Sequence, residues 1–254
     1  MCSGDNRSIG AIDNLETGLT SEKMKRPKAL LLDFYGTLVE EDHGPIKAAC
    51  RQIADAAKKP VDPLELYAEW WATFSKICTN SHGENFLLER EIEIKTIEIL
   101  LKRYNADFNS EEIEDKLYHH WEHPEIFPDT NKFIEDCDVP ICIVSNVDND
   151  PFYNALKHTK LSFDLIVTSE DCKSYKPRPE TFDKALTLLG MSNEEVIHIG
   201  DSLYTDVAGA KALGIRTLWI DNRGNRIEPE EPKPDYIAPT IRGVIDILNA
   251  RARE

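Results

Sequence analysis

Five short apolar runs, separated along the chain by segments of helical character, constrain the fold of this sequence most strongly. Each run is continuous in apolar and β-branched residues, which is typical of strands in a parallel sheet covered on both faces. The runs lie at residues 28–34, 140–146, 164–170, 196–201 and 215–221, with helical segments at 151–160, 178–190 and 205–213. This alternation predicts an α/β fold with a doubly wound parallel sheet.

The long segment between the first two runs differs, because its apolar residues recur at helical spacing. Asp62 followed by Pro63 is typical of an N-cap and the first position of a helix. The residues expected on buried helix faces are Ile46, Ala49, Cys50, Ile53, Ala57, Tyr67, Trp71, Phe74, Ile94, Ile97, Leu101, Tyr104, Ile113, Leu117 and Trp121. We therefore predict a helical cap at 41–123, inserted into a core formed by 27–40 and 124–254, and a polar, disordered tail at 1–26.

The overall charge of the chain excludes several classes of partner. Lys plus Arg number 30 and Asp plus Glu number 46, which gives a net charge of −16. Such a surface repels nucleic-acid backbones and anionic lipid. No apolar run approaches the roughly 20 residues that span a bilayer, and the first residues lack the apolar centre of a secretory signal. The six cysteines form no CxxC pair, as is typical of a cytoplasmic protein with reduced thiols.

Polar side chains end three of the predicted strands. Asp33, Ser145 and Asp201 would meet at the carboxyl edge of the sheet, where such folds bind ligands. A carboxylate at this edge can attack an electrophile and form a covalent intermediate that water then cleaves. Two carboxylates crowded together repel each other, and the pKa of one of them rises unless a cation lies between them.

Four motifs at strand or loop ends give the chain a specific resemblance. They are "DFYGTL" at 33–38, "VSN" at 144–146, "YKPRPE" at 175–180 and "GDSLYTD" at 200–206. In this order, and with a helical insertion after the first, they resemble the haloacid dehalogenase superfamily of hydrolases. The resemblance implies a Rossmann-like core, a cap over the active edge and hydrolysis of a small anionic substrate.

The resemblance also implies roles for individual residues. Asp33 would be the nucleophile and Lys176 a point charge that faces the anionic substrate. The ligands of a Mg²⁺ ion would be Asp33, the backbone carbonyl of Tyr35, and Asp201. Thr37, Gly36, Ser145 and Asn146 would surround the anionic oxygens of the substrate. Ser202 and Asp206 would orient metal-bound water or Lys176 from behind the ligands.

Tyr35 gives conflicting guidance about the reaction. Phosphatases of this superfamily usually carry an aspartate at that position, which exchanges a proton with the leaving group. A phenol with a pKa of about 10 is a poor proton shuttle near neutral pH, and losing a general acid typically lowers the rate by about 10² to 10⁴. The 2-haloacid dehalogenase branch resembles this chain in having a tyrosine there. Its reaction needs neither a proton donor for the halide nor a metal.

Asp201 favours the other branch, because dehalogenases have a small neutral residue at that position. We therefore expect Mg²⁺-dependent, phosphatase-like hydrolysis, with 2-haloacid dehalogenation as the main alternative. A phosphonate hydrolase and a non-catalytic, ligand-binding relative are further alternatives. A dehalogenase needs a cap arginine in the site, and a phosphonate hydrolase needs a cap lysine. The residues available are Arg51, Arg90, Arg103, Lys47 and Lys76, and the pocket or packing aromatics are Trp70, Trp71, Phe74 and Phe86. We expect His119, His120 and His123 at the surface and His198 in the core.

Overall fold

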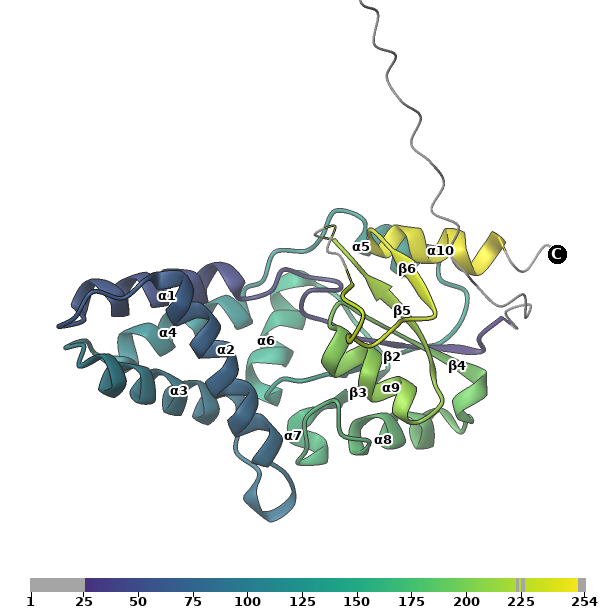
Figure 1. Cartoon of the computed structure of the whole chain (residues 1–254). Coiled ribbons are helices and arrows are strands. Elements are labelled where there is room, and N and C mark those ends of the chain that lie inside the picture. Colours follow the sequence, from purple (N-terminus) through teal and green to yellow (C-terminus); the bar gives the residue numbers. More distant parts are fainter. Residues whose placement is uncertain (1–25, 223, 225–226, 251–254) are drawn as a thin grey trace, which may run out of the picture.

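A six-stranded, entirely parallel sheet forms the centre of the computed structural model, which describes residues 26–222, 224 and 227–250. The strand order is β3-β2-β1-β4-β5-β6 (Figure 1). The strands are β1 (Ala29–Leu32), β2 (Ile141–Ser145), β3 (Leu165–Thr168), β4 (Val196–Gly200), β5 (Arg216–Ile220) and β6 (Tyr236–Ala238). The five predicted strands and the doubly wound α/β class are confirmed.

Alternate residues of β1 explain why its sequence is apolar throughout. Leu30 and Leu32 pack on one face of the sheet in a cluster with Phe152, whereas Leu31 packs on the other face with Phe182. The first face is covered by α5 (Thr130–Asp136), α6 (Asn149–Thr159) and α10 (Ile241–Ala250), and the second by α8 (Glu180–Leu189) and α9 (Gly209–Ala212). Both faces of β1 are therefore buried, and each of its positions needs an apolar residue until the strand ends.

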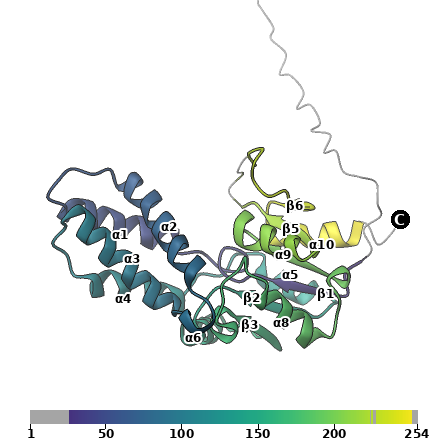
Figure 2. The ribbon, with the colours of Figure 1, turned by 60° about the horizontal axis from the view of Figure 1, so that its bottom comes forward.

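A helical insertion leaves the sheet after β1 and returns at β2. It comprises α1 (His43–Ala56), α2 (Pro63–Asn80), α3 (Glu89–Tyr104) and α4 (Ser110–Glu122), with a short 3₁₀ turn at Gly83–Asn85. Figures 1 and 2 show these helices as a bundle beside the sheet. The bundle has a hydrophobic cluster of its own, which includes Ile53, Trp70 and Leu117. The Asp62 side chain caps α2 by accepting from the Leu64 N–H at 2.9 Å, as the sequence predicts.

The buried face of α3 differs from the expected one. Among the expected residues only Ile97 is fully buried; Ile94 is half-buried. The residues that are fully buried on this helix are Ile92, Glu93, Thr96, Ile97 and Leu100. Two of them are polar, so a search for apolar periodicity misplaces the face. The insertion therefore turns a carboxylate inward.

The first turn of α3 is bound to the core. The Asp148 carboxylate, at the start of α6, accepts from the backbone N–H groups of Glu89 at 2.8 Å and Arg90 at 3.0 Å. These N–H groups have no partner within their own helix, and a carboxylate at a helix N-terminus is also favoured by the helix dipole. A core residue thus completes a helix of the insertion.

The remaining connections position two loops beside the sheet edge. α7 (Ser169–Cys172) precedes the loop that carries Lys176, and a π-helix (Leu203–Ala208) follows β4 and continues into α9. The predicted tail at 1–26 lies outside the described residues except for Arg26, which pairs with Asp138. The five described cysteines are free. Within the described ranges, no helix is both long and apolar enough to cross a bilayer.

Candidate active site

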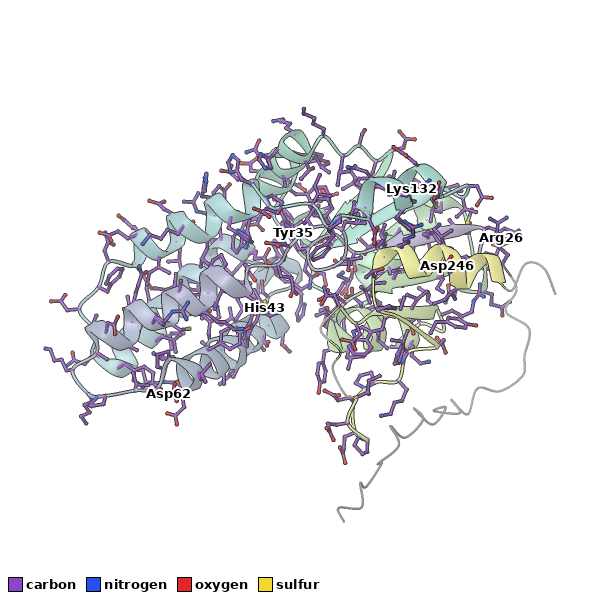
Figure 3. The ribbon with its side chains drawn as sticks, turned by 90° about the horizontal axis from the view of Figure 1, so that it is seen from above. Arg26, Tyr35, His43, Asp62, Lys132 and Asp246 are labelled. Carbon is purple, nitrogen blue, oxygen red and sulfur yellow. The ribbon has the colours of Figure 1, made fainter. Side chains whose placement is uncertain are left out.

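A cavity of ≈ 200 Å³ lies where the carboxyl ends of β1, β2 and β4 meet the helical insertion. Figure 3 shows this junction, with Tyr35 where the core meets the bundle and His43 at the near end of the bundle. The lining residues are Asp33, Tyr35, Glu41, Asp42, Trp71, Phe74, Glu89, Glu93, Trp121, Ser145, Asn146, Val147, Lys176, Asp201, Ser202, Thr205 and Asp206. The polar strand ends therefore meet at one site, as the sequence predicts.

Lys176 is the electrostatic centre of the core side of this cavity. Its side chain is 4% exposed, and its Nζ donates to Asp33 Oδ1 at 2.7 Å, to Asp206 Oδ1 at 2.6 Å and to the Val144 carbonyl at 2.8 Å. Burial alone would lower the pKa of Lys176, but the negative charges of Asp206 and Asp33 outweigh it and raise the pKa. The ammonium stays charged, and its three protons all have acceptors.

Asp206 is held by partners on both oxygens. Oδ1 accepts from His198 Nε2 at 2.9 Å as well as from Lys176, and Oδ2 accepts from the Ser202 N–H at 3.0 Å. Burial would raise the pKa of Asp206, but Lys176 and His198 lower it below its usual range. A Cβ at Gly200 would overlap the Asp206 carboxylate, so only glycine fits there. His198 is buried in the core as expected, and it also positions Asp206.

Asp33, at the end of β1, is 6% exposed and has two unequal oxygens. Oδ1 accepts from Lys176 and from the Ser145 hydroxyl at 3.3 Å, whereas Oδ2 accepts from the Thr37 hydroxyl at 3.4 Å. Burial raises the pKa of Asp33 to about 6, against the lowering effect of Lys176. Oδ2 therefore accepts fewer hydrogen bonds than Oδ1.

Asp201 follows β4 and lies beside the first motif. Burial raises the pKa of Asp201 well above its usual value, and the charges of Glu41, Asp33 and Asp206 add to the shift. Gly36 has φ +81°, and a Cβ there would lie 2.6 Å from the Asp201 Cγ. The glycine of the first motif is thus needed both for its backbone conformation and for space beside Asp201.

The carboxylates of Asp33, Asp201 and Asp206 form a group with metal-binding character. One oxygen from each lies within 4.8 Å of the others, and this is the one such cluster among the residues that the structure describes. The site holds more negative charge than Lys176 neutralises, and carboxylate oxygens are the hard ligands that Mg²⁺ prefers. The residues present therefore fit a divalent cation. Both Asp206 oxygens already accept hydrogen bonds, which suits a role behind the ligands.

Three site residues predicted from the sequence make unexpected contacts. The Tyr35 hydroxyl donates to the Trp121 carbonyl of α4 at 2.7 Å, and burial raises the pKa of Tyr35 further. The Asn146 side chain bonds the backbone N–H and carbonyl of Lys176, at 2.7 and 3.1 Å. The Gly36 N–H donates to the Val39 carbonyl at 2.8 Å. These contacts fix the loops around the cavity.

The cap arginines and lysines that the alternatives require do not line the cavity. Arg90 pairs with Glu114 at 2.5 Å and Arg103 with Glu69 at 2.6 Å. Lys176 is the one Lys or Arg among the described residues that line it. Trp71 and Phe74 line the cavity, whereas Trp70 packs in the cluster of the insertion and Phe86 stacks on Tyr175.

The histidines of α4 lie outside the cavity. His119 and His123 are exposed, as expected. His120 is half-buried, and its Nε2 lies 3.0 Å from the Glu41 carbonyl. The prediction of a surface position is therefore confirmed for His119 and His123, whereas His120 is partly covered.

Sequence reasoning missed four acidic residues of the insertion that line the cavity. They are Glu41, Asp42, Glu89 and Glu93. Glu41 and Asp42 lie three and four residues after the end of the first motif, and Glu89 and Glu93 are one helical turn apart on α3, so the sequence held a signal for both pairs. Acidic residues so close together usually indicate a solvated face, which is why the signal was not recognised.

A known protein family matches this chain over most of its length, and individual relatives match different shares of it. Residues 30–220 match the family described as haloacid dehalogenase-like hydrolase. The chain is 25% identical over 209 residues to (S)-2-haloacid dehalogenase 4A of Burkholderia cepacia. The aligned region covers 80% of this chain and 87% of that enzyme. It is 35% identical over 95 residues to pyrophosphatase PpaX of Halalkalibacterium halodurans, which covers 36% of this chain and 42% of that enzyme. The chain thus spans less than half the length of the second relative.

Solved structures share the fold. The L-2-haloacid dehalogenase RSc1362 superposes with a TM-score of 0.74 at 17% identity, over 89% of this chain and 100% of that one. The putative HAD-hydrolase YfnB from Bacillus subtilis, solved bound to magnesium, gives a TM-score of 0.67 at 24% identity, again over 89% and 100%. The family match extends from β1 to β5 and contains all four motifs. The chain therefore belongs to the haloacid dehalogenase-like hydrolase family.

Proposed function

We propose that the protein is a Mg²⁺-dependent hydrolase of small phosphate monoesters in which Asp33 is the nucleophile. The observation that carries this proposal is the position of Asp201 beside Asp33. Lys176 bonds Asp33 and Asp206, whereas the pKa of Asp201 is raised by burial and by its acidic neighbours. A divalent cation between Asp33 and Asp201 would relieve the repulsion between these carboxylates. A reaction without a metal would have no use for an aspartate at position 201.

The residues around the cluster would share the binding of cation and substrate. Asp33, Asp201 and the Tyr35 backbone carbonyl would hold Mg²⁺, which supplies positive charge to the phosphate oxygens. The Thr37 and Ser145 hydroxyls and Lys176 would hold the remaining phosphate oxygens, on loops braced by Gly36 and Asn146. Ser202 and Asp206 would support these groups from behind, since the Ser202 N–H already bonds Asp206.

The two oxygens of Asp33 have different tasks in this reaction. Lys176 and Ser145 hold Oδ1, which leaves Oδ2 directed by Thr37 alone and able to attack phosphorus. An Oδ2–phosphorus bond forms as the bond from phosphorus to the leaving alcohol breaks. Water then attacks phosphorus, the Oδ2–phosphorus bond breaks, and Asp33 is regenerated. Tyr35 is bonded to Trp121, so the proton for the leaving alcohol must come from another group that lines the cavity or from water.

The same insertion would act as the cap. In this proposal residues 41–123 close over the core formed by 27–40 and 124–254, and the cavity between them admits only a small anionic substrate. The Tyr35–Trp121 bond and the Asp148 contacts to α3 support this role, because both join the insertion to the core beside the nucleophile. A cytoplasmic location stays a prediction from the cysteine pattern.

A second candidate is 2-haloacid dehalogenation. Tyr35 in the first motif favours it, and so does the 87% coverage of the Burkholderia cepacia dehalogenase. The cavity opposes it, since no described arginine lines the site to hold the carboxylate of a haloacid.

A panel of phosphate monoesters and 2-haloacids, each with Mg²⁺ or with a chelator, tests the proposal. We expect turnover of phosphate esters that chelation abolishes, and a loss of about 10⁴-fold or more in Asp33→Asn. Asp246→Asn, an exposed position on α10, is the matched control and should keep full activity.

The position of the oxygen label after one turnover in H₂¹⁸O separates the candidates. Attack of water on phosphorus places the label in phosphate, whereas attack on the acyl carbon of an Asp33 ester places it in the aspartate. Label in Asp33, or haloacid turnover that survives chelation, would establish the dehalogenase instead.

A further inference from the structure

The insertion side of the cavity is acidic and aromatic, which a phosphate group alone does not explain. We define the acid–aromatic wall as Asp42, Glu89, Glu93, Trp71, Phe74 and Trp121, all of which line the cavity. The single lysine of the cavity is already committed to three acceptors on the core side. The wall therefore presents three carboxyl groups, and no lysine or arginine lies beside them among the described lining residues.

Glu93 is the most deeply buried carboxyl group of the wall, whereas Asp42 already accepts from the Trp121 indole at 3.1 Å. Glu93 is 1% exposed, and its Oε2 atom has no hydrogen-bond donor. Burial raises the pKa of Glu93 well above its usual value, and the neighbouring Trp70 indole opposes this rise. A buried carboxyl oxygen without a donor is destabilising, and such groups in native proteins normally have a hydrogen-bond partner in the protein, in ordered water or in a bound ligand.

The shape of the wall favours an organic cation over a metal ion. A metal needs several oxygens that converge at 2.0 to 2.6 Å from it. The wall carboxylates form no cluster of this kind in the part of the chain that the structure describes, whereas Asp33, Asp201 and Asp206 do. Aromatic faces beside carboxylates are instead the setting in which ammonium groups bind, because the ring quadrupole attracts a diffuse cation.

We propose that the acid–aromatic wall binds an ammonium group, so that the substrate is the phosphate monoester of a small amino alcohol. This inference rests on the proposed phosphatase function: Asp33, Lys176 and Mg²⁺ take the phosphate end, and the wall takes the cationic end. The cavity of ≈ 200 Å³ limits the substrate to a few carbons between the two ends. An additional substrate carboxylate is disfavoured, because the wall offers no basic residue to receive it.

Kinetics on matched esters test the proposal. With Mg²⁺ present, kcat/KM for O-phosphoethanolamine should exceed that for n-propyl phosphate by about tenfold or more, since the first makes a charge-assisted contact that the second lacks. O-phosphoserine should be a poorer substrate than O-phosphoethanolamine. Glu93→Gln should reduce the preference for the ammonium ester about tenfold, whereas Glu98→Gln, exposed on the same helix, should leave it unchanged.

A binding measurement keeps the test separate from catalysis. Ethanolamine should raise the unfolding temperature of the wild-type protein, 1-propanol at equal concentration should not, and Glu93→Gln should lose the ethanolamine effect. Equal kcat/KM for the two esters in a working phosphatase would overturn the ammonium site and leave the phosphatase intact. Failure to hydrolyse any phosphate ester would overturn the phosphatase. A second Mg²⁺ equivalent that Glu93→Gln removes would show that the wall is a metal site.

Discussion

Two buried carboxyl groups on opposite sides of the cavity, Asp206 and Glu93, have opposite surroundings. On the core side, Asp206 has a donor for each oxygen and its pKa is lowered. On the insertion side, burial raises the pKa of Glu93 well above its usual value, the charge of Asp42 adds to the shift, and Oε2 has no donor. Asp206 is thus fully paired before any substrate arrives, which suits a group that positions Lys176. In the proposal above, a ligand would supply the missing donor to Glu93.

The largest effect should come from removing the lysine that completes the core side. Lys176→Met leaves Asp33 and Asp206 buried without their counter-charge, which should lower the free energy of unfolding by about 3 to 5 kcal/mol. Urea unfolding monitored by circular dichroism measures this. Lys132→Met, which removes an exposed pair with Asp136 on α5, should change stability by about 1 kcal/mol or less. Equal losses in the two variants would mean that the Lys176 pairs add no stability.

A smaller effect, of opposite sign, should follow from replacing an ionisable carboxyl group on the insertion side. The folded protein binds the Glu93 proton more tightly than the unfolded chain, in which Glu93 has the ordinary glutamate pKa of 4.5. As the pH rises above that value the unfolded chain releases the proton first, so the wild-type protein loses stability. Glu93→Gln cannot ionise. Above the pKa of Glu93 in the folded protein, the free energy of unfolding of the variant should therefore exceed that of the wild type. The difference is about 1.4 kcal/mol for a tenfold tighter binding of the proton.

Unfolding free energies of both proteins from pH 5 to pH 9, without metal or ligand, measure this difference. Glu98→Gln provides the exposed control and should follow the wild-type profile. Parallel profiles for Glu93→Gln and the wild type would show that Glu93 is not held in its protonated form by burial.

The smallest effect should come from the contact that joins the two sides. Tyr35→Phe keeps the ring but removes the hydrogen bond to the Trp121 carbonyl, which should cost about 0.5 to 1.5 kcal/mol. The pH–rate profile near neutrality should keep its shape, because the pKa of the phenol lies far above that range. Tyr153→Phe, on the exposed side of α6, is the control. Loss of one limb of the profile in Tyr35→Phe would identify the phenol as the proton donor after all.

The core side could be predicted from the sequence and the insertion side could not. The positions of Asp33, Ser145 and Asp201 follow from the sequence, because a polar residue at the end of an apolar parallel strand lies at the carboxyl edge of the sheet. Glu93 and Thr96 were missed because hydrophobic periodicity counts only apolar residues, and both are polar residues on a buried face. The family resemblance supplied Lys176, whereas nothing in the sequence indicated that Asp148 would cap α3.

The Asp148 cap has a consequence for how the cavity could exchange its contents. Glu89 belongs to the first turn of α3 and Glu93 to the next, and the N–H groups of that first turn are bound to a core carboxylate. A hinge motion that preserves these two bonds would pivot near residue 89 and move the bundle as one body, because its helices share one hydrophobic cluster, so the start of α3 would stay close to the core while α1 and α2 move farthest. Entry and exit would then proceed past Trp71 and Phe74 of α2, and these two rings would act as the gate.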